Sequence, residues 1–96
     1  MLPFENIIHV DRNSNIAIYK QIAISIINAV NNGTLKAGAK LPSSRELSKL
    51  LGLHRKTIVA AYEELSAQDW IQSSPRKSIT VSNQIPILYP KIDAKQ

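Results

Sequence analysis

The sequence of 96 residues contains no cysteine, which excludes a disulfide framework and a thiolate metal site. Its two histidines, His9 and His54, lie far apart in the sequence, and this spacing argues against a zinc site. The longest apolar-rich stretch, residues 16–30, is interrupted by polar side chains and cannot span a bilayer. The N-terminus lacks the charged and apolar segments of a signal peptide. We therefore expect a cytoplasmic domain with no membrane partner.

The residue groupings that usually carry catalysis are also missing. The sequence shows no Ser-His-Asp or Cys-His grouping and no glycine-rich phosphate loop. Glu63 and Glu64 are adjacent, so on a helix their carboxylates point in different directions. We predict that the chain is not an enzyme and holds no metal or cofactor of its own.

The charge that is present is concentrated in one segment. The chain carries a net charge of +5, with hydrophobic residues at 44% and charged residues at 20%, an ordinary balance for one small globular domain. The window of residues 36–58 carries all of the excess positive charge, because the rest of the chain has as many acidic as basic residues. The basic residues of the window are Lys36, Lys40, Arg45, Lys49, Arg55 and Lys56. Such a segment indicates a polyanionic partner, although a solvated basic face is the alternative.

The first part of the chain predicts a lead-in followed by a helix. Residues 1–15 read as an irregular N-terminal lead-in, in which Ile7, Ile8 and Val10 form a short extended piece. Residues 16–32 predict a helix that ends at Gly33, a residue suited to a left-handed cap. Its apolar stripe consists of Tyr19, Ile22, Ala23, Ile26, Ile27 and Val30, with Lys20, Gln21, Asn28 and Asn31 on other faces. Ile24 lies off this stripe, either as an ordinary exposed residue or as a contact with another domain or chain.

Two further helices and a hairpin follow. Residues 43–51 predict a short helix, at whose start Ser43 and Glu46 form a capping box. Leu41, just before this helix, is a candidate for a short strand. The buried stripe of this helix is expected at Leu47, Leu50 and Leu51. Gly52 breaks the pattern, and a third helix is expected over about residues 54–68. Its core face holds Ile58, Tyr62 and Leu65, whereas Lys56, Val59, Ala60 and Glu63 point away. Residues 70–73 and 78–81 predict two strands, and residues 83–96 a linker or tail.

Two short helices joined by a tight turn with glycine describe a helix-turn-helix, whose second helix enters the major groove of DNA. The predicted fold is therefore mainly α with a small β-hairpin wing, a winged helix-turn-helix with a three-helix core, over residues 16–82. At the start of its third helix, Arg55 and Lys56 can donate to guanine, Thr57 can donate to phosphate or touch a thymine methyl, and His54 can donate to phosphate. Arg45 and the start of the second helix, which includes Ser44, can hold a phosphate.

Each of these residues also has a plain structural interpretation. Arg55 or Lys56 alone is most often an ordinary surface cation, and Arg45 can pair along its own helix. Thr57 can be a partly buried helix residue, and Arg76 and Lys77 in the hairpin turn can simply be solvated. The joint arrangement favours DNA binding, with Lys36, Lys40 and Lys49 adding non-specific attraction. The competing hypothesis is a winged helix that docks another protein, for which Val59 and Ala60 supply some apolar surface.

Residues 17–82 resemble the N-terminal winged helix-turn-helix of the GntR superfamily. The resemblance rests on residues 18–22, 33–47 and 51–65. The family hallmark is matched over its whole length by Gly33, Leu35, Gly38, Leu41, Pro42, Ser43, Arg45 and Leu47. The resemblance implies double-stranded DNA as the partner, with a homodimer on a palindromic or repeated operator. It places the DNA contacts at Arg45, His54, Arg55, Lys56, Val59 and the wing tip at Arg76.

Three departures from the family pattern change what the resemblance implies. His54 stands where a small hydroxyl residue usually caps the recognition helix, and Val59 stands where some relatives carry an arginine. The turn around Arg76 lacks the glycines that let a wing approach the minor groove closely.

The segments at 41–45 and 61–65 resemble the MocR-type branch in particular. In that branch the DNA-binding domain precedes a large aminotransferase-like domain that binds pyridoxal phosphate. The resemblance therefore implies that the chain is an isolated domain, either a designed fragment or a truncated gene product. Its residues 83–96 then lead toward an absent effector domain.

Overall fold

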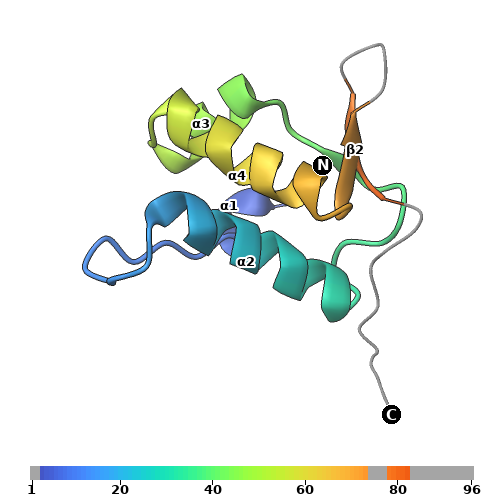
Figure 1. Cartoon of the computed structure of the whole chain (residues 1–96), viewed down its shortest axis with the longest axis horizontal. Coiled ribbons are helices and arrows are strands. Elements are labelled where there is room, and N and C mark those ends of the chain that lie inside the picture. The colour runs from blue at the N-terminus through green and yellow to red at the C-terminus, as the bar shows by residue number, and fades with distance from the viewer. Residues whose placement is uncertain (1–2, 74–77, 83–96) are drawn as a thin grey trace.

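The computed structural model describes residues 3–73 and 78–82, so the wing tip with Arg76 and Lys77 and the tail at 83–96 lie outside the described residues. The described chain is mainly α-helical with a small antiparallel sheet at one end (Figure 1). In chain order its elements are α1 (Phe4–Ile7), α2 (Ile18–Asn31), β1 (Lys40–Leu41), α3 (Ser44–Leu51), α4 (Arg55–Ala67), β2 (Ile71–Ser73) and β3 (Ile79–Val81). The predicted fold of three larger helices and a wing is confirmed.

The core lies between α2 and α4 and is closed by α3. Ile22 and Ile26 on α2, Leu47 on α3, and Ile58 and Leu65 on α4 are completely buried. Burial of one such side chain contributes about 1.5–3 kcal/mol, so these contacts set the relative positions of the three helices. Their outer faces are left to solvent and to partners. No helix in residues 3–73 and 78–82 has the length and apolarity to cross a membrane.

The prediction of an extended piece with Ile7, Ile8 and Val10 is wrong for Ile7, which lies in a helical turn. Phe4–Ile7 forms the single helical turn α1, in which the backbone N–H groups of Ile7 and Ile8 donate to the carbonyls of Pro3 and Phe4. Phe4 is 2% exposed and α1 packs against α2 and α3. The chain becomes extended only at Ile8, which is itself buried. The four residues of α1 are too few to show the helical spacing of apolar side chains, so the sequence pattern could not predict this turn. The turn places Phe4 in the core.

Two residues on the larger helices also differ from expectation. Gln21, expected on an outer face, is buried, and its amide accepts from the backbone N–H of Asp11 at 2.6 Å and donates to the carbonyls of Asp11 and Ile16. An amide both donates and accepts, so one buried side chain satisfies three backbone groups of the preceding loop. Leu50, expected in the buried stripe of α3, is 46% exposed because the core covers only the side of α3 that carries Leu47.

The wing is a three-stranded sheet in the order β1-β3-β2, so Leu41 does lie in a short strand. Thr80 on the central strand β3 is opposite Lys40 on one side and Gln72 on the other. Just before β1, the N–H of Gly38 donates to the carbonyl of Val81, and the N–H of Val81 donates to the carbonyl of Ala39. The sheet is therefore joined to the loop between α2 and α3. Directly before β2, Trp70 is 3% exposed and belongs to the core.

Candidate nucleic-acid interface

The capping box expected at the start of α3 is present. The hydroxyl of Ser43 accepts from the backbone N–H of Glu46 at 3.1 Å, and the carboxylate of Glu46 accepts from the N–H of Ser43 at 2.9 Å. The backbone and hydroxyl hydrogen bonds with Ser43 lower the pKa of the Glu46 carboxyl, and the charge of Lys40 acts in the same direction. The box fixes where α3 begins and how its first N–H groups are directed.

The turn between α3 and α4 has the geometry of a helix-turn-helix. Gly52 adopts a left-handed conformation with a φ of 66° and its N–H donates to Ser48, which ends α3. Leu53 is partly buried and packs against the core. His54 is the N-cap residue of α4, with an extended backbone and a carbonyl that accepts from Thr57 and Ile58. His54 makes no capping hydrogen bond with its side chain, so its imidazole is not the cap of α4.

A buried hydrogen bond ties α4 to the entry of α3. The hydroxyl of Tyr62 donates to the carbonyl of Pro42 at 2.7 Å, and both residues are buried. Burial raises the pKa of the Tyr62 hydroxyl well above its ordinary value, and the nearby charge of Glu46 raises it further. The phenol is therefore protonated at neutral pH and can donate this hydrogen bond. This bond sets α4 relative to the capping box on α3.

A second contact joins the exposed starts of the two helices. The Nε–H of Arg55, the first residue of α4, donates to the hydroxyl of Ser44, the first residue of α3, at 3.2 Å. A guanidinium has about five N–H donors, and this contact engages only the one on Nε. The structure thus brings together two predicted site residues that are eleven positions apart.

The other predicted residues fall into three groups. Arg45, His54 and Lys56 are exposed near the starts of α3 and α4, whereas Thr57 is half-buried. Val59 is 37% exposed, one turn further along α4. Lys36 lies apart from them, exposed in the loop after α2.

Sequence reasoning missed a hollow between α4 and the sheet. It is lined by Ser44, Val59, Tyr62, Glu63, Ser66, Ile71, Ser73 and Ile79. These residues come from α3, α4, β2 and β3, so no local pattern could have grouped them. A second hollow, on the outer face of α4, is lined by Arg55, Lys56, Val59, Ala60 and Glu63.

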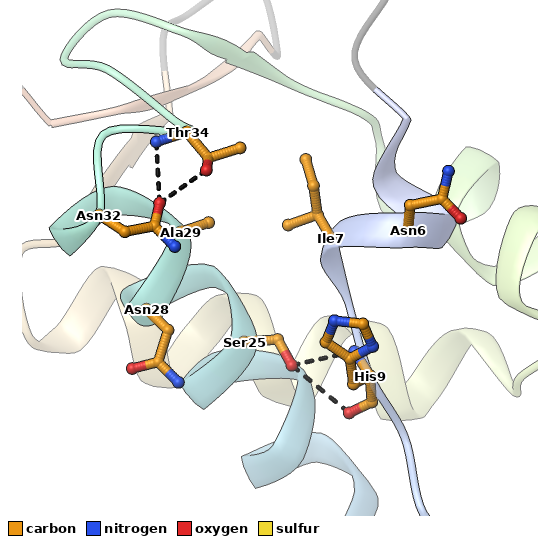
Figure 2. A pocket seen from close by; sticks show the side chains of 8 residues that line it. All are labelled: Asn6, Ile7, His9, Ser25, Asn28, Ala29, Asn32 and Thr34. Carbon is orange, nitrogen blue, oxygen red and sulfur yellow. Dashed lines mark hydrogen bonds between the residues drawn. The ribbon is translucent and has the colours of Figure 1, made fainter.

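A polar pocket lies elsewhere, between α1 and the C-terminal half of α2 (Figure 2). Ser25 and the backbone of His9 exchange hydrogen bonds there, and the backbone N–H and hydroxyl of Thr34 donate to Asn32. His9 is the one ionisable side chain among the residues that line it. Within residues 3–73 and 78–82, no group of three or more His, Cys, Asp or Glu side chains is placed to hold a metal ion.

Residues 18–81 match the family described as "Bacterial regulatory proteins, gntR family". The chain belongs to the GntR family. This GntR domain is 35% identical over 66 residues to the HTH-type transcriptional regulator YdeL of Bacillus subtilis, covering 69% of the chain and 14% of YdeL. It is 32% identical over 81 residues to the pyridoxine biosynthesis transcriptional regulator PdxR of Corynebacterium glutamicum, covering 83% of the chain and 18% of PdxR. The chain therefore spans less than a fifth of the length of these relatives.

Solved structures agree with the GntR assignment. The GntR-family transcription factor YtrA from Sulfolobus acidocaldarius is 39% identical and superposes with a TM-score of 0.78, covering 82% of this chain and 83% of YtrA. The N-terminal domain of AraR, solved in complex with mutant ORR3, is 27% identical with a TM-score of 0.64, covering 70% of this chain and 96% of that one. The chain is thus the winged helix-turn-helix DNA-binding domain of a GntR-type transcription regulator, and its fold is not that of an enzyme.

Proposed function

We propose that this domain reads double-stranded DNA with the first turns of α4 in the major groove and the start of α3 against the phosphate backbone. The observation that carries the proposal is the Arg55–Ser44 hydrogen bond, which holds the N-terminal ends of the two helices side by side. In a helix-turn-helix these are the ends that meet DNA. An AraR domain with the same fold was solved in complex with an operator named ORE1.

Roles for the individual side chains follow from their places. Arg55 and Lys56 donate to guanine, and Thr57 reaches a phosphate or a thymine methyl. Arg45 and His54 hold phosphates beside the start of α3, where the free backbone N–H groups favour an anion. Ser44 acts through Arg55 by fixing its guanidinium. Lys36, with Arg76 and Lys77 of the wing tip, adds attraction that does not depend on sequence.

We infer further that the domain works within a longer regulator that acts as a homodimer on a palindromic or repeated operator in the cytoplasm. Two copies of a helix-turn-helix read two half-sites about one helical turn of DNA apart. A likeness of 25% to the probable rhizopine catabolism regulatory protein MocR of Rhizobium meliloti, covering 17% of that protein, supports a MocR-type parent. In such a parent, pyridoxal phosphate binds to a separate domain, and no residue of this chain takes part.

The test is selection of bound sequences from a random DNA library, followed by footprinting and by titration of variants. Arg55→Ala should weaken binding to the selected sequence by about 1–3 kcal/mol and relax the preference at one position. Lys20→Ala removes an exposed charge from α2 and is the matched control. An equal loss on all sequences for Arg55→Ala would contradict the base contact. Absence of DNA binding at low salt would favour the alternative, a protein-docking winged helix.

A further inference from the structure

The recognition helix carries an apolar side chain in the middle of its basic surface. Val59 is 37% exposed, although Ile58 directly before it and Ala61 two positions after it are completely buried. Val59 follows Arg55 by four positions, so the two side chains are neighbours on one face of α4. With Ala60 it lies between the cations Arg55 and Lys56 and the carboxylate of Glu63, around the hollow on the outer face of α4.

The lining of this hollow restricts what it can bind. Arg55 and Lys56 can attract a phosphate at one side of the hollow, whereas Val59 and Ala60 offer no donor and the carboxylate of Glu63 repels an anion on the other side. A polar base edge placed against Val59 would lose water without gaining a partner, which is costly. The one apolar group that a base pair presents in the major groove is the C5 methyl of thymine.

We propose that Val59, with Ala60, forms a contact for the C5 methyl of a thymine next to the base pair read by Arg55. This inference rests on the proposed major-groove binding of α4 and deepens it. Side chains four positions apart on a helix are separated by about 5–6 Å at their Cβ atoms. Successive bases on one DNA strand are about 3.4 Å apart. The thymine therefore lies one or two base pairs from the guanine.

The experiment uses the DNA sequence selected for this chain and replaces each thymine in turn with deoxyuridine. Deoxyuridine lacks the C5 methyl and keeps the hydrogen-bonding edges of thymine. One position within two base pairs of the Arg55-dependent guanine should lose affinity by about fourfold, which corresponds to about 0.8 kcal/mol for one buried methyl group. Val59→Ala should bring the thymine-to-uridine ratio at that position close to one.

Two controls separate Val59 from other apolar groups. Thr57→Ser removes the rival methyl on the same helix and keeps the hydroxyl, and Ile24→Ala trims an apolar side chain on α2 that is 46% exposed. Ile24→Ala should keep both the affinity and the fourfold ratio, whereas Thr57→Ser can change the overall affinity but should keep the ratio at the position assigned to Val59. Because Val59 and Ile24 are exposed, their variants should unfold close to the temperature of the parent chain, and circular dichroism checks this.

The outcomes distinguish this inference from the function on which it rests. Failure to bind any DNA overturns both. Sequence-specific binding without a uridine-sensitive position, or with no thymine in the selected half-site, overturns the methyl contact alone. Loss of the ratio in Thr57→Ser but not in Val59→Ala reassigns the contact to Thr57 and also overturns the proposal for Val59.

Discussion

Single side chains connect the two helices of the motif in different ways, and Tyr62 does so from the interior. Its hydroxyl donates to the carbonyl of Pro42 directly before the capping box. Both groups are out of water, so removing the hydroxyl leaves a buried acceptor without its partner.

Tyr62→Phe should therefore lower the free energy of unfolding by about 1–3 kcal/mol while leaving the ring in place. Urea denaturation followed by circular dichroism measures the change. Tyr19→Phe is the matched control, because Tyr19 is only half-buried on α2 and should lose much less. Equal losses in the two variants would mean that the Pro42 contact contributes nothing specific.

The adjacent residues Ser43 and Ser44 are expected to have different roles, Ser43 in the stability of α3 and Ser44 in the recognition of DNA. Ser43→Ala removes the N-cap of α3 and should cost about 1 kcal/mol of stability, with the DNA preference largely kept. Ser44→Ala should leave stability nearly unchanged and weaken discrimination at the base pair assigned to Arg55. Parallel urea titrations and competition binding with matched and mismatched duplexes check both. If both variants changed stability and DNA discrimination to the same extent, the two serines would not have these separate roles.

At the scale of elements, α3 depends on the charge of one carboxylate. Hydrogen bonds from Ser43 hold the pKa of Glu46 below its ordinary value of 4.5. A lowered pKa in the folded state means that the contribution is present above pH 4.5. It is lost as the pH falls through the value in the folded state.

The difference in unfolding midpoint between the parent chain and Glu46→Gln should thus shrink as the pH is lowered from 7 to 3. Glutamine keeps the reciprocal hydrogen bond of the box, so the comparison isolates the charge. Thermal unfolding across this range measures it, with Glu5→Gln on the exposed side of α1 as the control. A difference that is constant with pH would rule out an ionised capping box.

The turn between α3 and α4 depends on the backbone freedom of Gly52. An added Cβ there would meet no atom within 4 Å, so only the φ of 66° opposes a side chain. Gly52→Ala should cost about 1–2 kcal/mol, and Gly52→Asn less, since asparagine tolerates the left-handed region. Chemical denaturation of the pair measures the difference. An equal cost for the two would point to a steric cause instead.

Those elements whose signals are local could be predicted from the sequence. The capping box of Ser43 and Glu46, the glycine turn and the apolar spacing of α2 and α4 are each contained in a few neighbouring residues. The helical turn at Phe4, the burial of Gln21 and the exposure of Leu50 could not be predicted, because tertiary packing decides each of them. For the candidate site, the sequence predicts which residues face outward. It does not predict the Arg55–Ser44 and Tyr62–Pro42 hydrogen bonds, because folding brings these distant residues together.

Over the whole molecule, the net charge of +5 comes from residues 36–58, which run from the loop after α2 through the start of α4. Binding to DNA should weaken steeply with salt, because each neutralised phosphate releases counterions. Lys36→Ala should weaken binding to all sequences similarly and reduce the slope of log K against log salt concentration by about one. Binding titrations from 50 to about 200 mM salt measure the slope. Lys20→Ala should not change this slope. If Lys20→Ala and Lys36→Ala reduced the slope equally, the attraction to DNA would depend on the total charge and not on the position of Lys36.

The buried position of Trp70 has a practical consequence for every one of these experiments. It is the only tryptophan in the sequence and is 3% exposed in the core, directly before β2. Its fluorescence emission should shift to longer wavelength when the domain unfolds, and it should change little when DNA binds to the outer face of α4. The same cuvette can thus report folding optically while a labelled duplex reports binding, so an unfolded variant is distinguished at once from a folded one that has lost its DNA contact.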